Sequence, residues 1–211
     1  VGVCTRDRES KRIEKLESLG VSNIRVFEFD MTDYSAVDSV ATDIKEWCGG
    51  KLNGLVNNAA VAHGGLIQST KLDDVKSVFE TNLFSILYLT QKLHRYLRRA
   101  NGSAIINMSS IASIAPGRGQ VGYGVSKAAI NALTTVMANE YRTDNILVNA
   151  ILPAVLDSGM ASQMSADAIS EQLKKMSHND IVGVDDVTKL VLALLERRLH
   201  SQTGQLLRLD N

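Results

Sequence analysis

Short β-rich runs alternate with longer segments of helical periodicity along the chain. The runs typical of strands cover 1–4, 24–28, 52–56, 104–108, 147–151 and 206–209. The helical segments between them cover 8–19, 35–47, 72–99, 123–141 and 184–199. Strands separated by helices of this length need right-handed crossovers, which produce a parallel sheet covered on both faces. The sequence therefore predicts a doubly wound α/β fold of the Rossmann type.

No stretch rich in proline, serine or glycine divides the chain, and we expect residues 1–211 to form a single domain. The alternation of strand-like and helix-like segments is interrupted at 109–122 and at 153–179, each time after a predicted strand. Ligands of open parallel sheets bind beyond the carboxyl ends of the strands. These two segments are therefore where a site is expected.

The balance of charges and apolar residues excludes several classes of protein. Lys and Arg number 23, as do Asp and Glu, so nothing indicates a nucleic-acid partner or an anionic membrane surface. The most apolar stretch, 146–156, is shorter than the ~18 residues that a membrane span requires. Cys4 and Cys48 form no C-x-x-C, and the histidines show no paired spacing, so we expect neither a metal site nor a disulfide. A reducing cytoplasm is the expected compartment.

Tyr123 and Lys127 lie four residues apart at the start of a predicted helix, on one face. A phenol with a pKa of about 10 is a weak acid at neutral pH. A cation about 4 Å away, at an effective dielectric near 20, contributes roughly 4 kcal/mol, equivalent to about three pKa units. We therefore expect Lys127 to lower the pKa of Tyr123. The spacing alone is weak evidence, since Tyr88 and Lys92 repeat it in an amphipathic helix.

The surroundings distinguish the two pairs. Ser110 precedes Tyr123 by thirteen residues and follows a predicted strand, whereas Val75 occupies the equivalent place before Tyr88. A hydroxyl at the carboxyl end of a strand can hydrogen-bond the oxygen that a phenol protonates. The sequence thus predicts that Ser110, Tyr123 and Lys127 form one catalytic group.

With these motifs the chain resembles the short-chain dehydrogenase/reductase family over essentially its whole length. The matching segments, in order, are Asp30 in Phe29-Asp30-Met31-Thr32-Asp33 for D-V-T-D, Asn57-Asn58-Ala59-Ala60 for N-N-A-G, Asn82 for the catalytic asparagine, Ser110 with Tyr123-x-x-x-Lys127, and Thr203-Gly204-Gln205 for T-G-Q. Within the family the general resemblance is to 3-oxoacyl-(acyl-carrier-protein) reductases.

The resemblance implies a role for each matching residue. Tyr123 would be the general acid/base, Lys127 would lower its pKa and bind the nicotinamide ribose, Ser110 would orient the substrate oxygen, and Asn82 would support a water relay. It further implies a dinucleotide held by Asp30, Met31, Asn58, Ala59, Tyr123, Lys127, Pro153, Leu156 and Ser158. Ser158 could equally cap the following helix.

The choice of cofactor depends on Thr5 and Arg6, at the end of a predicted strand. An acid there would accept hydrogen bonds from the ribose diol of NAD and repel a 2′-phosphate. Arg6 instead offers a planar cationic fork that suits phosphate. NADP(H) is therefore favoured over NAD(H). In the alternative, Arg6 is a solvated cation and Asp7 or Glu9 reads the diol.

Three departures from the family pattern stand out. Ala154 and Ala60 replace glycines, and each adds a methyl group near the expected cofactor path. The glycine-rich turn, with its strand and helix, is missing from the sequence. Because that strand would lie in the middle of the sheet, we expect the sequence to be preceded by about thirty further residues, the size of one β-α unit.

These features predict an NADPH-dependent reductase that converts a small-molecule ketone, for instance a 3-oxoacyl thioester, to a secondary alcohol. The resemblance also implies a homo-oligomer, a dimer or a tetramer, paired through helices 72–99 and 123–141. One alternative is a catalytically inactive nucleotide-binding relative with a regulatory role. Another is a hydrolase, because Gly124-Val-Ser126-Lys-Ala128 nearly fits a nucleophile elbow, with Asp185 or Asp186 and His200 following. That elbow requires a strand directly before the serine.

Overall fold

The computed structural model describes residues 1–7, 13–14, 18, 23–154, 182–198 and 202–209, and most of the expected helix at 8–19 lies outside these ranges. The strands are β1 Gly2–Thr5, β2 Arg25–Glu28, β3 Gly54–Asn57, β4 Ser103–Met108, β5 Ile146–Pro153 and β6 Leu206–Leu209. The longer helices are α2 Tyr34–Trp47, α3 Leu72–Phe79, α4 Ser85–Ala100, α5 Val121–Glu140 and α7 Val184–Leu195. Short turns of helix are η1 Glu80–Phe84, η2 Ile111–Ser113 and η3 Tyr141–Asp144.

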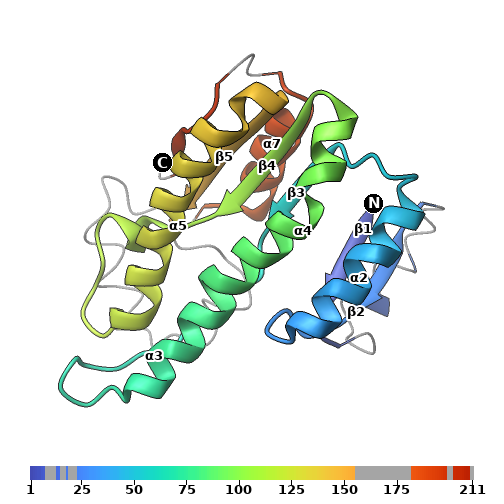
Figure 1. The fold of residues 1–211 in the computed structure, drawn as a ribbon. Coiled ribbons are helices and arrows are strands. Elements are labelled where there is room, and N and C mark those ends of the chain that lie inside the picture. Colours follow the sequence, from blue (N-terminus) through green and yellow to red (C-terminus); the bar gives the residue numbers. More distant parts are fainter. Residues whose placement is uncertain (8–12, 15–17, 19–22, 155–181, 199–201, 210–211) are drawn as a thin grey trace.

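All the strand pairs are parallel, as expected, and the strands form two groups. β1 pairs with β2, and the other group has the order β3-β4-β5-β6. The two groups are separated between β1 and β3 (Figure 1). Every residue of β4 is buried, as is typical of a central parallel strand covered on both faces.

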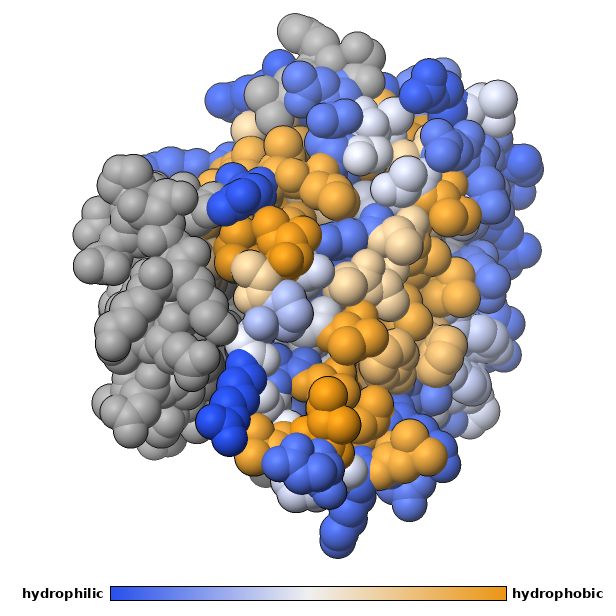
Figure 2. Space-filling view, turned by 90° about the vertical axis from the view of Figure 1, so that its left-hand side faces the viewer, coloured by the Kyte–Doolittle hydropathy of each residue, from blue (hydrophilic) through white to orange (hydrophobic). Residues whose placement is uncertain are grey.

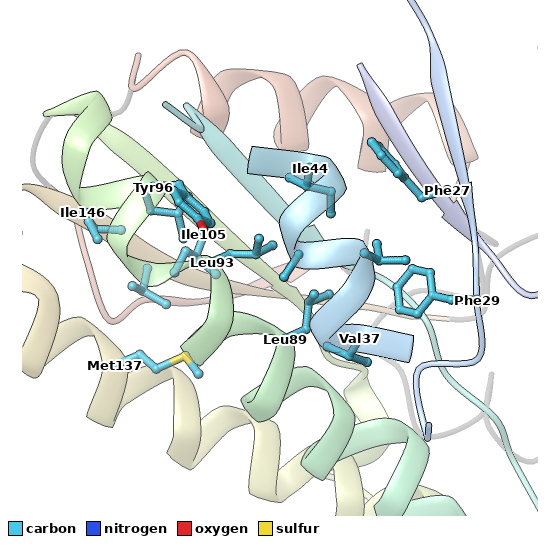
Figure 3. Packing of buried hydrophobic residues seen from close by; sticks show 14 of the residues in the cluster. Phe27, Phe29, Val37, Ile44, Leu89, Leu93, Tyr96, Ile105, Met137 and Ile146 are labelled. Atoms are coloured by element: carbon cyan, nitrogen blue, oxygen red, sulfur yellow. The ribbon is translucent and has the colours of Figure 1, made fainter. Parts of the chain in front are cut away.

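Alternate residues of β4 supply two separate hydrophobic clusters. Ile105 packs in the cluster with α2, α4 and α5, whereas Ile106 packs in the cluster with α7. In Figure 3, side chains of α2 such as Val37 point toward α4, where Leu89 meets them. Because the side-chain period of a strand is two, this division shows that helices cover both faces of the sheet. The doubly wound α/β fold is confirmed.

The helix expected over 72–99 is interrupted. α3 ends at Phe79, and one π-helical turn, η1, precedes α4. A π turn inserts one residue into the helical ladder and turns the following side chains, and such turns are frequent at functional sites. The interruption places Asn82 on the side of the helix that meets α5.

Candidate active site

Ser110 stands directly beyond the carboxyl end of β4, with Ser109 between them. Its backbone is extended, and its side-chain oxygen accepts a hydrogen bond from the backbone N–H of Ala112 at 3.1 Å, which makes Ser110 the N-cap of η2. A hydroxyl can accept and donate at the same time. The capping bond therefore leaves the hydroxyl proton of Ser110 available for a second partner.

That partner is Tyr123, in the first turn of α5. The side chains of Ser110 and Tyr123 are hydrogen-bonded, and both residues are partly exposed. Gly124 permits this approach, because a Cβ there would lie 3.0 Å from the carbonyl oxygen of Ala112 and 3.0 Å from Pro116 Cβ. The loop after β4 can therefore lie close against α5.

Lys127 lies one helical turn further along α5 and is 2% exposed. Its Nζ lies 5.7 Å from the centroid of the Tyr123 ring and donates a hydrogen bond to the carbonyl oxygen of Met108 at 2.6 Å. The structure thus brings Ser110, Tyr123 and Lys127 together, as predicted, at the carboxyl end of a central strand.

The expected effect of Lys127 on the pKa of Tyr123 is wrong for this structure. Burial raises the pKa of the Tyr123 phenol, and only the hydrogen bond with Ser110 opposes the rise. Burial also lowers the pKa of the Lys127 ammonium to about 8. An ammonium about 4 Å from the phenol would lower its pKa, whereas the ammonium of Lys127 is directed to the Met108 carbonyl. At neutral pH the phenol is therefore protonated, and Lys127 is predominantly charged.

Asn82 is fully buried, and its amide bonds within the protein. Its Nδ2 donates to the carbonyl oxygen of Val61 at 2.9 Å and to Ser126 Oγ at 3.0 Å, while its Oδ1 accepts from the backbone N–H of Val61 at 2.8 Å. Ser126 in turn donates to the carbonyl oxygen of Tyr123 at 2.8 Å. The side chain of Asn82 thereby joins the segment after β3 to the start of α5, and its part in a water relay stays a prediction.

The hydrolase alternative fails on the position of Ser126. This serine lies inside α5 and is fully buried, and its hydroxyl is bonded to the carbonyl oxygen of Tyr123. A nucleophile elbow requires a strand immediately before an exposed serine. Asp185 and Asp186 are exposed in the first turn of α7, and His200 lies outside the described residues.

The residues expected to read the ribose follow β1 and β2. The Thr5 hydroxyl donates to the carbonyl oxygen of Asp7 at 2.9 Å and accepts from its N–H at 3.1 Å, forming a local turn. Arg6 is exposed in this turn, and its charge helps to lower the pKa of Asp30, although hydrogen bonds from Thr32 contribute more. Arg6 and Asp30 therefore lie near each other, beyond the carboxyl ends of β1 and β2.

The remaining cofactor candidates are distributed over the other strand ends. Met31 is partly buried, Asn58 and Ala59 are exposed directly after β3, and Pro153 is buried as the last residue of β5. Leu156 and Ser158 lie outside the described residues. Thus the structure places every described candidate at the carboxyl end of a strand or just beyond it.

Two features of the described residues suit a polar, hydroxyl-bearing cofactor. Asn57 Oδ1, at the end of β3, is buried without a hydrogen-bond partner in the described part of the chain. The ammonium of Lys127 has three donors, and Met108 takes one of them. Buried polar groups are normally paired, so these atoms fit a ligand that brings both donors and acceptors, as a dinucleotide ribose does.

Hydrogen bonds also connect residues that the sequence analysis did not single out. Asn131 lies one turn beyond Lys127 on α5 and bonds to Ser109 and Ser113, which flank Ser110. The one available signal was its position four residues after Lys127, on the same helical face.

Two properties of the described residues concern other classes of site. They contain no group of three or more His, Cys, Asp or Glu side chains arranged to hold a metal ion. None of their helices is both long enough and apolar enough to cross a membrane.

The fold and these motifs agree with the comparisons to known proteins. The family model described as "Enoyl-(Acyl carrier protein) reductase" matches residues 1–211. The 3-oxoacyl-(acyl-carrier-protein) reductase FabG of Chlamydia pneumoniae is 32% identical over 160 residues, which are 76% of this chain and 64% of that protein. FabG of Chlamydia trachomatis is 28% identical over 196 residues, or 92% of this chain and 79% of that protein.

A solved structure supports the same assignment. The Pseudomonas aeruginosa RhlG/NADP active-site complex matches with a TM-score of 0.89 and 25% identity, over 100% of this chain and 84% of that one. A short-chain dehydrogenase/reductase from Burkholderia xenovorans, at 23% identity, has the same fold, with a TM-score of 0.89. The chain therefore belongs to the short-chain dehydrogenase/reductase family of NAD(P)-dependent oxidoreductases.

Proposed function

We propose that this protein reduces a ketone to a secondary alcohol with NADPH, and that Tyr123 gives the proton to the carbonyl oxygen. One observation carries the proposal: the hydroxyls of Ser110 and Tyr123 meet at a partly exposed position beyond β4, with the buried ammonium of Lys127 behind them. A carbonyl oxygen placed there would receive two hydrogen bonds. Both would strengthen as negative charge develops on the oxygen.

The residues divide the proton chemistry between them. When bound, NADPH supplies the hydride that reduces the carbonyl carbon. Ser110 holds the carbonyl oxygen, and Tyr123 transfers its phenolic proton to that oxygen as the alkoxide forms. Lys127 holds the end of β4 through the carbonyl oxygen of Met108, and its remaining donors would bind the nicotinamide ribose. Because burial keeps the phenol protonated at neutral pH, Tyr123 starts the reaction in the form that a proton donor needs.

Arg6 supports the preference for NADPH. Its exposed guanidinium lies beyond β1 beside Asp30, where a 2′-phosphate could receive paired hydrogen bonds. A similar structure, that of Pseudomonas aeruginosa RhlG, is described as an NADP complex. Arg6→Ala should weaken NADPH more than NADH, and a wild-type preference for NADH would contradict the assignment.

The names of the relatives suggest the substrate class. The curated relatives are 3-oxoacyl-(acyl-carrier-protein) reductases, whereas the family model carries the name of an enoyl reductase. We favour a 3-oxoacyl thioester, because Ser110 and Tyr123 converge on one oxygen and a ketone reduction needs a proton there. A panel of 3-oxoacyl and enoyl thioesters separates the two reactions.

A homo-oligomer would cover apolar side chains that stand exposed on the helices. Phe84 of η1 and Val125 and Val136 of α5 are 46%, 49% and 49% exposed. Figure 2 shows hydrophobic residues gathered on the side of the molecule that carries α3 and α5. We therefore propose a dimer or tetramer paired through these helices and located in the cytoplasm, where Cys4 and Cys48 would stay reduced.

The decisive experiment follows NADPH oxidation by the intact protein over the thioester panel, with Tyr123→Phe measured in parallel. Turnover of a 3-oxoacyl thioester that depends on Tyr123 is the expected result. Nucleotide binding without turnover of any substrate would favour the inactive, regulatory alternative.

A further inference from the structure

On the basis of the proposed function, we infer that Asn131 is a positioning residue for the reaction. Its amide fastens both sides of Ser110 to α5 and so fixes the hydroxyl that meets Tyr123. The Asn131 side chain bonds to the serines that flank Ser110, and it acts through them.

A chain of short hydrogen bonds encloses Ser110. The Ser109 hydroxyl donates to Asn131 Oδ1 at 2.7 Å, and Asn131 Nδ2 donates to Ser113 Oγ at 2.8 Å. Ser113 then donates to the carbonyl oxygen of Ser110 at 2.6 Å. Ser109 is 5% exposed and Asn131 is 8% exposed, so water competes little with these bonds.

The partners specify an amide at this position. The Ser113 proton is committed to the Ser110 carbonyl, so its oxygen must accept, and only a donor on residue 131 can satisfy it. Ser109 supplies a proton and needs an acceptor. An aspartate would offer acceptors to both serines and would bury a charge. A leucine would leave Ser113 only its bond to the Ser110 carbonyl and Ser109 only its longer bond to the Lys127 carbonyl at 3.2 Å, so nothing would link the two serines.

Lys127 and Asn131 together hold the end of β4. Lys127 bonds the carbonyl oxygen of Met108, and Asn131, one turn later, bonds the next residue, Ser109, and also Ser113. The segment from 108 to 113 is therefore attached to α5 on both sides of Ser110, while the Ser110 side chain stays available to Tyr123. Loosening this attachment displaces the hydroxyl. A displacement on the scale of 1 Å lowers a rate by up to about a hundredfold.

The test compares Asn131→Ala with Asn149→Ala in the intact protein. Asn149 is a matched control, because it is 3% exposed and its amide also bridges two partners, donating to the carbonyl oxygen of Gln202 and accepting from the N–H of Gln205, each at 3.0 Å. We expect both variants to lose stability, and only Asn131→Ala to lose kcat, by about tenfold to a hundredfold, with little change in the KM for cofactor.

A pH profile separates positioning from a general structural role. The Ser110 hydrogen bond lowers the pKa of Tyr123, so weakening it should move the limb on which alcohol oxidation rises with pH to higher pH in Asn131→Ala and not in Asn149→Ala. Ser113→Ala removes one link and keeps the packing of Asn131, so it should show the same shift even if Asn131→Ala folds poorly. An unshifted limb in both Asn131→Ala and Ser113→Ala, or equal kcat losses in the two asparagine variants, would overturn the role of Asn131.

A wild-type protein without nicotinamide-dependent turnover would refute the proposed function instead. The role of Asn131 is then tested without substrate by following the Tyr123 phenol with NMR of labelled tyrosine, assigned with Tyr123→Phe. A higher pKa for Tyr123 in Asn131→Ala than in Asn149→Ala supports the role, and equal pKa values contradict it.

Discussion

The chain contains two Tyr-x-x-x-Lys pairs, one on α5 and one on α4, and they have different surroundings. Lys127 is buried and directed to a backbone carbonyl, while Tyr123 meets Ser110. On α4, Lys92 Nζ lies 2.6 Å from Asp38 Oδ1 and 4.6 Å from the centroid of the Tyr88 ring, and the Tyr88 hydroxyl donates to the same carboxylate at 3.0 Å.

The comparison shows that a helical spacing brings two side chains to one face, and that the neighbouring elements decide what they can do. On α4, Lys92 forms a partly exposed ion pair with Asp38 of α2, and Tyr88 bonds to the same carboxylate. The pair on α5 stands at the end of a central strand, beside a hydroxyl and away from competing carboxylates in the described structure. The same substitution should therefore affect kcat in the pair on α5 and leave it unchanged in the pair on α4.

Removal of the phenolic hydroxyl should produce the largest difference. Tyr123→Phe should reduce kcat about a thousandfold, because a positioned general acid contributes roughly 10²–10⁴ to a rate. Tyr88→Phe should leave kcat unchanged. Steady-state kinetics of both variants checks the comparison, and a loss in Tyr88→Phe similar to that in Tyr123→Phe would show that the two pairs are not functionally distinct.

The lysines should differ in both activity and stability. Lys127→Met should lower kcat/KM about a hundredfold, because it removes the bond that holds the end of β4 and the donors proposed for the nicotinamide ribose. It should also raise the free energy of unfolding at pH 7 by about 2 kcal/mol, since relief of a buried ammonium outweighs the lost bond to Met108. Lys92→Met should change neither property appreciably. Denaturant unfolding and kinetics measure both, and a destabilised Lys127→Met would contradict the burial argument.

The residue after each tyrosine offers a smaller contrast. Gly124→Ala places a methyl group 3.0 Å from the Ala112 carbonyl and from Pro116, so the loop that carries Ser110 must shift. We expect a loss of about tenfold in kcat, the order of effect that small misplacements produce. The equivalent position on α4 is Leu89, a core residue, where Leu89→Ala should cost about 2–5 kcal/mol of stability and affect kcat little in the folded fraction. An active Gly124→Ala with normal kcat would show that the loop tolerates the shift.

The smallest expected effect is a pH dependence of stability. The native pKa of Lys127 is about 8, below its ordinary value of 10.5, so between these values the unfolded chain binds more protons. Stability should therefore rise with pH from about 8 to about 9, by at most about 1.4 kcal/mol per pH unit. Above pH 9 the pKa of Cys4, which burial raises to about 11, acts in the opposite direction, because the unfolded thiol loses its proton first. Above pH 10 the raised pKa of Tyr123 acts in the opposite direction, because the unfolded phenol loses its proton first. Unfolding curves of the wild type, Lys127→Met and Lys92→Met test this, and the slope should disappear only in Lys127→Met.

The element pattern and the grouping of Ser110, Tyr123 and Lys127 were accessible from the sequence, because both depend on patterns of neighbouring residues. Alternating strand and helix periods predicted the parallel sheet, and the hydroxyl after β4 distinguished Tyr123 from Tyr88. The π turn at Glu80–Phe84 was not accessible. No proline or glycine marks it, and the interruption accompanies the packing of Asn82 against Val61 and Ser126, residues distant in the chain.

Neighbouring residues specify the order of strands and helices, the side of each helix that is apolar and the choice of Ser110, Tyr123 and Lys127 as candidate catalytic residues. Other properties depend on groups separated by many residues and on how much water reaches them. They are the direction in which a pKa shifts, the partner of the buried ammonium of Lys127 and the attachment of Ser110 through Asn131. Those quantities exist only once α5 packs against the end of β4, and for that reason the tertiary structure alone decided them.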